Sequence, residues 1–180
     1  MPDCTSLLYF WGRKSTKKLN LKVNIFATLV EVKRYVLVGY YSVKAECNSR
    51  SEVDVFFKRM YEDPELKDEA IRLRYWITKI GNEIGGDPDY FRDERLCNAF
   101  PPPIEISHEY IGLRLYCYII NENLVVLYNG GKKIGNPAEK CPNVKHHFYN
   151  AQSWTKQIRE LEIESNGTII TNLKELEFRY

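Results

Sequence analysis

The sequence predicts an α+β fold, in which an antiparallel β-sheet (a meander) packs against an N-terminal helical hairpin and a C-terminal helix. Residues 35–43 (YVLVGYYSV) combine β-branched and aromatic side chains, which is typical of a strand. Residues 51–80 carry apolar side chains at helical spacing. Residues 113–128 form two strand-like runs joined by a short polar turn.

The helical hairpin has a start signal for each of its helices. Ser51 is followed three residues later by Asp54, a variant of the capping box, and Asp63-Pro64 places an N-cap residue before a proline. Gly81 and Gly85-Gly86 are the candidate ends of the second helix. The predicted buried stripes are Val53, Phe56, Phe57 and Met60 in the first helix, and Leu66, Ala70, Leu73, Ile77 and Ile80 in the second.

The second half of the chain predicts the meander and the last helix. Turn residues fill 87–103, which we expect to be a loop, and strands follow at 104–108, 113–120 and 124–128. A helix is predicted from His146 to Leu161, and a short strand over 168–171. In the middle strand we expect one face to enter the core and the other to be open. The core face holds Leu113, Leu115, Cys117 and Ile119. The open face holds Arg114, Tyr116, Tyr118 and Ile120.

The length of 180 residues fits one domain, and the 44% hydrophobic content is enough to fill a core. The formal net charge of +2 hides a basic start, because the first 50 residues carry nine Lys or Arg against three Asp or Glu. We therefore divide the chain into a basic N-terminal extension, 1–34, and a folded domain, 35–180. A basic zone suits a phosphate-bearing partner, although ordinary solvated faces would give the same charge pattern.

The five cysteines favour a reduced, cytoplasmic protein without a metal centre. Their number is odd, and none forms a CxxC pair or lies at zinc-ligand spacing from a histidine. No apolar run is long enough to cross a bilayer, and no secretion signal is recognised. We expect no metal and no nucleotide cofactor.

Metal-free cleavage of RNA would suit the side chains of the predicted open face. In this reaction the 2′-hydroxyl attacks its own phosphate, which needs a base, an acid and fixed cations. Arg114 offers a guanidinium to the phosphate, Lys132 and Lys133 offer further charge, and Tyr116 could stack on a base. His147, beside His146, titrates near neutrality and could transfer the proton.

Each of these residues also has a purely structural interpretation. Arg114 could pair with Glu105 on a neighbouring strand, and Lys132 and Lys133 could belong to a solvated turn. The two histidines could simply begin the last helix. Both interpretations stay open at this point.

Residues 112–118 (GLRLYCY) and 124–133 (LVVLYNGGKK) resemble the RelE/ParE toxin superfamily, over about residues 35–161. The resemblance implies the toxin of a type II toxin–antitoxin system, neutralised by a cognate antitoxin. RelE-like members cleave messenger RNA, commonly on the ribosome, without a metal. The best match to family active-site positions is Arg114, followed by Lys132 and Lys133.

The resemblance leaves two alternatives open. ParE-like members inhibit DNA gyrase, and a degenerate relative would bind nucleic acid or protein without toxicity. RelE-like sites often place an aromatic or basic residue near the C-terminus, whereas this chain ends in an acidic segment, 175–180 (ELEFRY).

Overall fold

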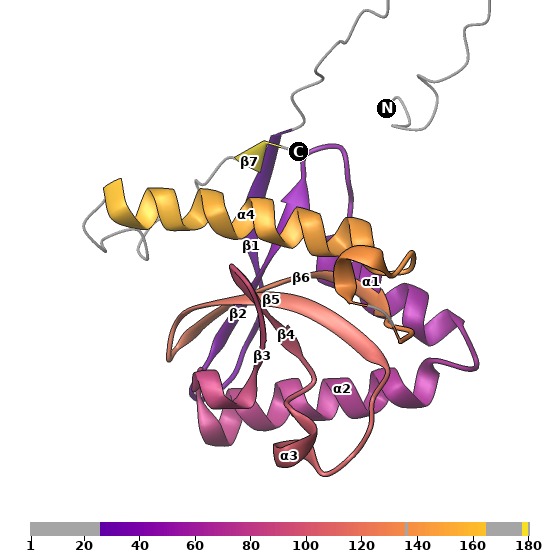
Figure 1. Ribbon diagram of the computed structural model, residues 1–180. Coiled ribbons are helices and arrows are strands. Elements are labelled where there is room, and N and C mark those ends of the chain that lie inside the picture. Colours follow the sequence, from indigo (N-terminus) through magenta and orange to yellow (C-terminus); the bar gives the residue numbers. More distant parts are fainter. Residues whose placement is uncertain (1–25, 136, 165–177, 180) are drawn as a thin grey trace, which may run out of the picture.

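The computed structural model describes residues 26–135, 137–164, 178 and 179, and shows an α+β fold (Figure 1). Its strands are β1 (Phe26–Arg34), β2 (Gly39–Ala45), β3 (Arg92–Glu94), β4 (Cys97–Phe100), β5 (Leu113–Asn121), β6 (Leu124–Lys132) and β7 (Phe178–Arg179). Its α-helices are α1 (Glu52–Glu62), α2 (Lys67–Lys79), α3 (Ile104–Ser107) and α4 (Lys145–Glu164). A π-helical turn, Ile80–Ile84, extends α2, and 3-10 turns occupy Pro88–Tyr90 and Ala138–Lys140.

The strands form one mixed sheet in the order β3-β4-β5-β6-β2-β1-β7. Strands β3 to β6 form the antiparallel meander, but β2 pairs with β6 in parallel, so the prediction of a purely antiparallel sheet is wrong. The reason is the long connection through α1, α2 and the first strands of the meander, which brings the chain back beside β2 in the same direction.

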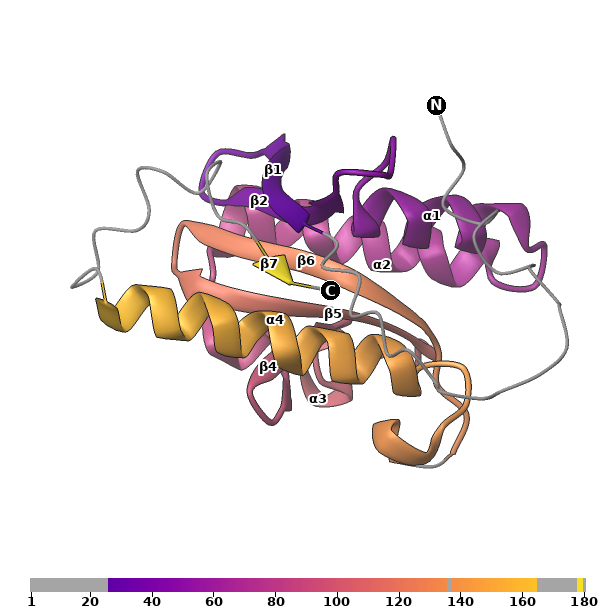
Figure 2. The same ribbon diagram turned by 90° about the horizontal axis from the view of Figure 1, so that it is seen from above.

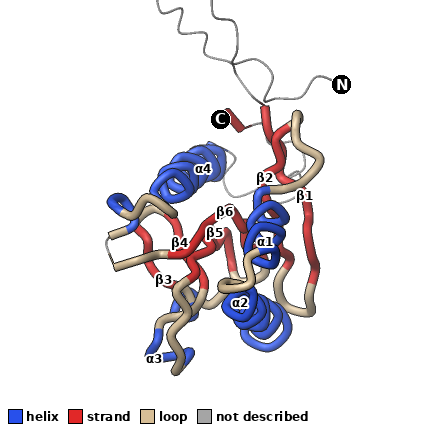
Figure 3. The backbone as a smooth tube through the Cα atoms, turned by 90° about the vertical axis from the view of Figure 1, so that its right-hand side faces the viewer, coloured by secondary structure: helices blue, strands red, loops and turns tan. Residues whose placement is uncertain are grey.

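Helices cover both faces of the sheet. Figures 2 and 3 show α1 and α2 on one side of the strands and α4 on the other. Each side has its own buried cluster: Leu113, Leu115 and Cys117 belong to the one under α1 and α2, and Tyr116 and Tyr118 to the one under α4. The two faces of β5 are therefore divided as predicted, but the face expected to be open is buried as well.

The signals for the helical hairpin act as predicted, with one shift. Ser51 caps α1, and both bonds of the capping box with Asp54 are present. Asp63 begins a single turn, and α2 proper starts only at Lys67. Gly85, with a φ of 90°, ends the helical segment in a conformation that glycine adopts most easily.

Two further secondary-structure predictions are wrong, and a third concerns residues that the structure does not describe. Residues 104–107 form helix α3 and not a strand, since Pro103 directly precedes its first turn. Residues 87–103, predicted as a loop, contain β3 and β4. The predicted strand at 168–171 lies outside the described residues.

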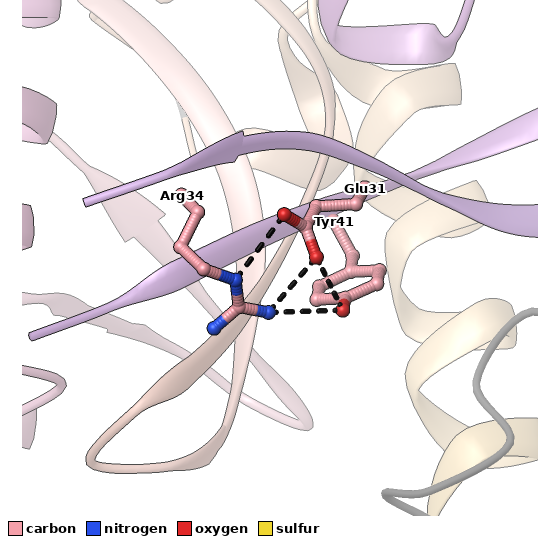
Figure 4. A network of polar contacts seen from close by, with 3 residues as sticks. All are labelled: Glu31, Arg34 and Tyr41. Carbon is pink, nitrogen blue, oxygen red and sulfur yellow. Dashed lines mark hydrogen bonds and ion pairs between the residues drawn. The ribbon is translucent and has the colours of Figure 1, made fainter. Parts of the chain in front are cut away.

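Residues 26–34, which the sequence analysis places in an extension, form β1 of the sheet. A polar network ties β1 to β2: the Arg34 guanidinium donates to both carboxylate oxygens of Glu31, at 2.9 and 3.2 Å, and to the Tyr41 hydroxyl (Figure 4). Tyr41 in turn donates to Glu31 at 2.7 Å. Gly39 leaves the space that the Arg34 guanidinium occupies.

A β-bulge in β6 sets the orientation of the residues that end this strand. Leu115 lies opposite Gly130, but Cys117 lies opposite Leu127, so β6 contains one more residue than β5 over this stretch. The extra residue reverses the alternation of side chains beyond it. Lys132 consequently lies opposite Leu113 and on the same face of the sheet, toward α2.

The close approach of β5 and β6 at the bulge predicts that Gly130 tolerates no side chain. A Cβ at this position would overlap the backbone oxygen of Arg114, which can move only if the strand pair opens. We expect Gly130→Ala to lower the free energy of unfolding by about 3 kcal/mol or more. The matched control is Gly112→Ala, whose Cβ would first meet the end of the Glu69 side chain, at 3.2 Å. Equal urea midpoints for the two variants would contradict this account of the bulge.

Candidate functional site

Arg114 lies under α4 and is held by backbone carbonyl groups. Only 9% of the surface of this residue is exposed to solvent. Nη1 donates to the carbonyl oxygens of Ile111 and Leu113, at 3.0 and 2.9 Å, while the buried Nε has no hydrogen-bond partner in the described part of the chain. The ion pair with Glu105 that the sequence allowed does not form.

The two adjacent lysines lie on opposite sides of the sheet. Lys132 forms an ion pair with Glu69 of α2, with 3.5 Å between Nζ and Oε1. Lys133 is the next residue, and its charge lowers the pKa values of Glu94 and Glu139. The β6 bulge is the cause of this division, so only Lys133 of the predicted pair lies on the same face of the sheet as Arg114.

Tyr116 cannot stack on a base in this structure, because it is fully buried. Its ring contacts the Phe148 ring of α4 edge to face, with 5.8 Å between centroids. Burial is the main cause that raises the pKa of its hydroxyl. This hydroxyl has no hydrogen-bond partner among the described residues. The expectation that Tyr116 offers an open aromatic surface is therefore wrong.

His147 is buried at a junction of α1, β6 and α4, apart from Arg114. Arg59 of α1 donates a hydrogen bond from Nη1 to Nε2 of His147 at 3.2 Å, and another from Nη2 to the side-chain oxygen of Asn129 at 3.0 Å. Burial, together with the charges of His146 and Arg59, lowers the pKa of His147 to about 3. A histidine that stays neutral and bonded to Arg59 is a structural group, which is the alternative that the sequence left open.

The sequence analysis missed two residues that the structure places beside Arg114. Arg92 of β3 lies opposite Ala99 of β4, and Ala99 lies opposite Tyr116, so Arg92 shares the face under α4. Glu94, two residues further along β3, lies on the same face. Arg92 and Glu94 alternate with other residues in the segment 91–96 (FRDERL), and this spacing could have indicated that they share one face of a strand. The surrounding turn residues led instead to the prediction of a loop.

Arg92 is anchored in the same way as Arg114. Its Nε and Nη2 donate to the carbonyl oxygens of Pro101 and Pro102, at 2.9 and 3.0 Å. Carbonyl oxygens orient a guanidinium without neutralising its charge. Burial lowers the pKa of both arginines, and the charge of Arg92 lowers that of Arg114 further.

Glu94 is the carboxylate that faces these cations. Burial raises its pKa, the charges of Lys133, Arg114 and Arg92 oppose that rise, and the charge of Glu139 adds to it. In the described ranges its carboxylate accepts no hydrogen bond and lies in no ion pair within 4.0 Å, and the same holds for ion pairs of the three cations. The Arg92–Glu94–Arg114–Lys133 cluster thus carries three positive charges and one negative charge. Two further carboxylates act on its members, Glu105 on Arg92 and Glu139 on Glu94.

Such a cluster can bind an anion and transfer a proton. Two anchored guanidinium groups and an ammonium group match the oxygens of a phosphodiester. A carboxylate whose pKa is raised is a better proton acceptor than an exposed one. The described residues hold no group of three or more His, Cys, Asp or Glu side chains that could bind a metal ion.

A groove of about 790 Å³ lies at the other end of β5, near the β5–β6 turn. Its wall includes Tyr118, but the Arg159 guanidinium lies over that ring, 5.4 Å from the centroid. No residue of the Arg92–Glu94–Arg114–Lys133 cluster lines this groove. It is therefore a separate feature of the surface.

The buried His147 predicts acid sensitivity of the fold. Its pKa is lowered on folding, so its contribution to stability is complete above the unfolded value of about 6.5 and is lost as the pH falls toward about 3. We expect His147→Gln to lose less stability than the native chain over this range, as measured by thermal unfolding against pH. The exposed neighbour serves as the control in His146→Gln. Parallel curves for His147→Gln and the native chain would refute the prediction.

Comparisons of the chain with protein-family models, curated proteins and solved structures give no significant match. No helix in the described ranges has the length and apolar character needed to cross a bilayer. The functional argument therefore depends on the residues of the cluster themselves.

Proposed function

We propose that the chain is a RelE/ParE-like toxin that cleaves messenger RNA without a metal, and that the Arg92–Glu94–Arg114–Lys133 cluster is its active site. One observation carries the proposal. The charges of Arg92, Arg114 and Lys133 all act on the half-buried Glu94 carboxylate, and none of the four side chains forms an ion pair within 4.0 Å among the described residues. Since buried cations without a direct ion-pair partner are costly, a site that binds an anion explains why they are kept.

The cluster can perform each step of the cleavage. Glu94 accepts the proton of the RNA 2′-hydroxyl, whose oxygen attacks the adjacent phosphorus. Arg114 and Lys133 stabilise the charge that grows on the phosphate oxygens, and Arg92 fixes their position. The bond to the 5′ oxygen then breaks, and this oxygen takes a proton from water. The products are a 2′,3′-cyclic phosphate and a free 5′-hydroxyl.

The remaining parts of the proposal come with the family resemblance. They are the RelE/ParE-like assignment of the fold, a cognate antitoxin that neutralises the protein, messenger RNA on the ribosome as the substrate, and a cytoplasmic location. The helical hairpin, the β4–β5–β6 meander and the C-terminal helix support the assignment at the level of element order.

A second candidate function is non-catalytic binding on the same scaffold, as in a gyrase-directed toxin or a non-toxic relative. The burial of Arg114 and Tyr116 under α4 favours it, because an extended RNA strand needs access to the reacting groups. The two candidates differ in their product: only the first generates RNA ends that carry a cyclic phosphate.

The positions of the two lysines give a sharp test of the active site. We expect Lys133→Ala to lower the rate of RNA cleavage by about 10- to 1000-fold, the range found for removal of one charge-stabilising group. Lys132→Ala should leave the rate within about twofold, because its ammonium group lies on the α2 side. The measurement is cleavage of messenger RNA after expression in bacteria, with mapped 5′ ends. Equal rates for the two variants would overturn the assignment of the site.

Glu94 gives a second test, which separates catalysis from binding. Glu94→Gln keeps the shape of the side chain but removes the proton acceptor, so we expect cleavage to fall by about 100-fold or more while RNA affinity is kept or rises. Asp93→Asn is the matched control, since Asp93 is exposed on the same strand. If Glu94→Gln cleaves at the native rate, the carboxylate has no catalytic role.

A further inference from the structure

Tyr110 lies at the open end of the β5–β6 pair, close to the Arg92–Glu94–Arg114–Lys133 cluster. Lys133 donates its backbone N–H to the Gly112 carbonyl oxygen at 2.9 Å, which holds the segment before β5 beside the segment after β6. Tyr110 precedes Gly112 by two residues. Arg114 donates a hydrogen bond from Nη1 to the carbonyl oxygen of Ile111 at 3.0 Å, so its guanidinium is anchored on the residue directly after Tyr110.

The Tyr110 side chain is exposed to an unusual degree for an aromatic residue. Its exposed fraction is 70%, and in the described structure it makes no hydrogen bond and no contact with another ring. Ile134, directly after Lys133 on the adjacent segment, is 61% exposed. Two large exposed side chains thus lie on the adjacent segments that lead to Arg114 and away from Lys133, open to a ligand.

We propose that Tyr110 stacks on a nucleobase of single-stranded RNA, next to the phosphate that Arg92 and Arg114 hold. This inference rests on the proposed function and adds a base-binding position to it. An aromatic ring beside backbone-binding cations is the usual means of holding an unpaired base, and such stacking tolerates any base because each has a π-face. Tyr110 is thereby a binding residue, and its hydroxyl is not required.

The test measures binding without cleavage. The probe is a short fluorescein-labelled RNA that carries 2′-O-methyl groups, which block the attack of the 2′ oxygen, and affinity is read by fluorescence anisotropy on the full chain. We expect Tyr110→Ala to weaken binding by about tenfold, within the range for loss of one stacked base. Tyr110→Phe should bind as the native chain does. The matched control is Tyr75→Ala, because Tyr75 is 56% exposed on α2, on the other side of the sheet.

A set of probes that lack one base each locates the contact. Removal of the stacked base should weaken binding to the native chain and leave binding to Tyr110→Ala unchanged. If Tyr110→Ala binds as tightly as Tyr75→Ala while Lys133→Ala binds weakly, the stacking inference is wrong and the phosphate site stands. If the native chain does not bind the probe at low salt, both are wrong.

Discussion

The burial of both faces of the sheet is the constraint on which the other features depend. Helices α1 and α2 cover one face and α4 covers the other (Figure 2), and residues from both faces of β5 belong to the buried clusters. A charged side chain on such a strand must find polar partners inside the protein. Arg114 and Arg92 find backbone carbonyl oxygens, which fix the guanidinium groups and leave their charge available. The resulting positive field under α4 is the basis of the proposed function.

The β6 bulge is the second structural cause of the site. Without the extra residue, Lys132 would lie under α4 and Lys133 would lie toward α2. The bulge exchanges the faces on which Lys132 and Lys133 lie, and so places Lys133 on the face of the cluster. It also leaves Gly130 against the Arg114 backbone, where no side chain fits. The same local irregularity therefore fixes the strand register and selects which cation acts at the site.

Sequence reasoning predicted the elements that have strong local signals. The capping box at Ser51 and the division of the β5 residues between two faces were predicted correctly, because each depends on residues close in the chain. It could not predict that α4 covers the second face, since apolar and aromatic residues such as Tyr116 suit a partner helix and a nucleobase equally well. Arg92 and Glu94 were missed because β3 has only three residues among turn residues. The bulge, which separates Lys132 from Lys133, gives no signal in the sequence pattern.

In the proposed site a phosphate binds the guanidinium of Arg114, whose buried Nε has no hydrogen-bond partner among the described residues. Its N–H resonance in a nitrogen-15 spectrum reports on this group directly, during a titration with a ribodinucleotide whose 2′ oxygen is methylated. The account predicts a saturable shift of the Arg114 signal, lost in Lys133→Ala and kept in Lys132→Ala. A signal that does not move at saturating dinucleotide would show that the guanidinium is a structural group, and would contradict the account.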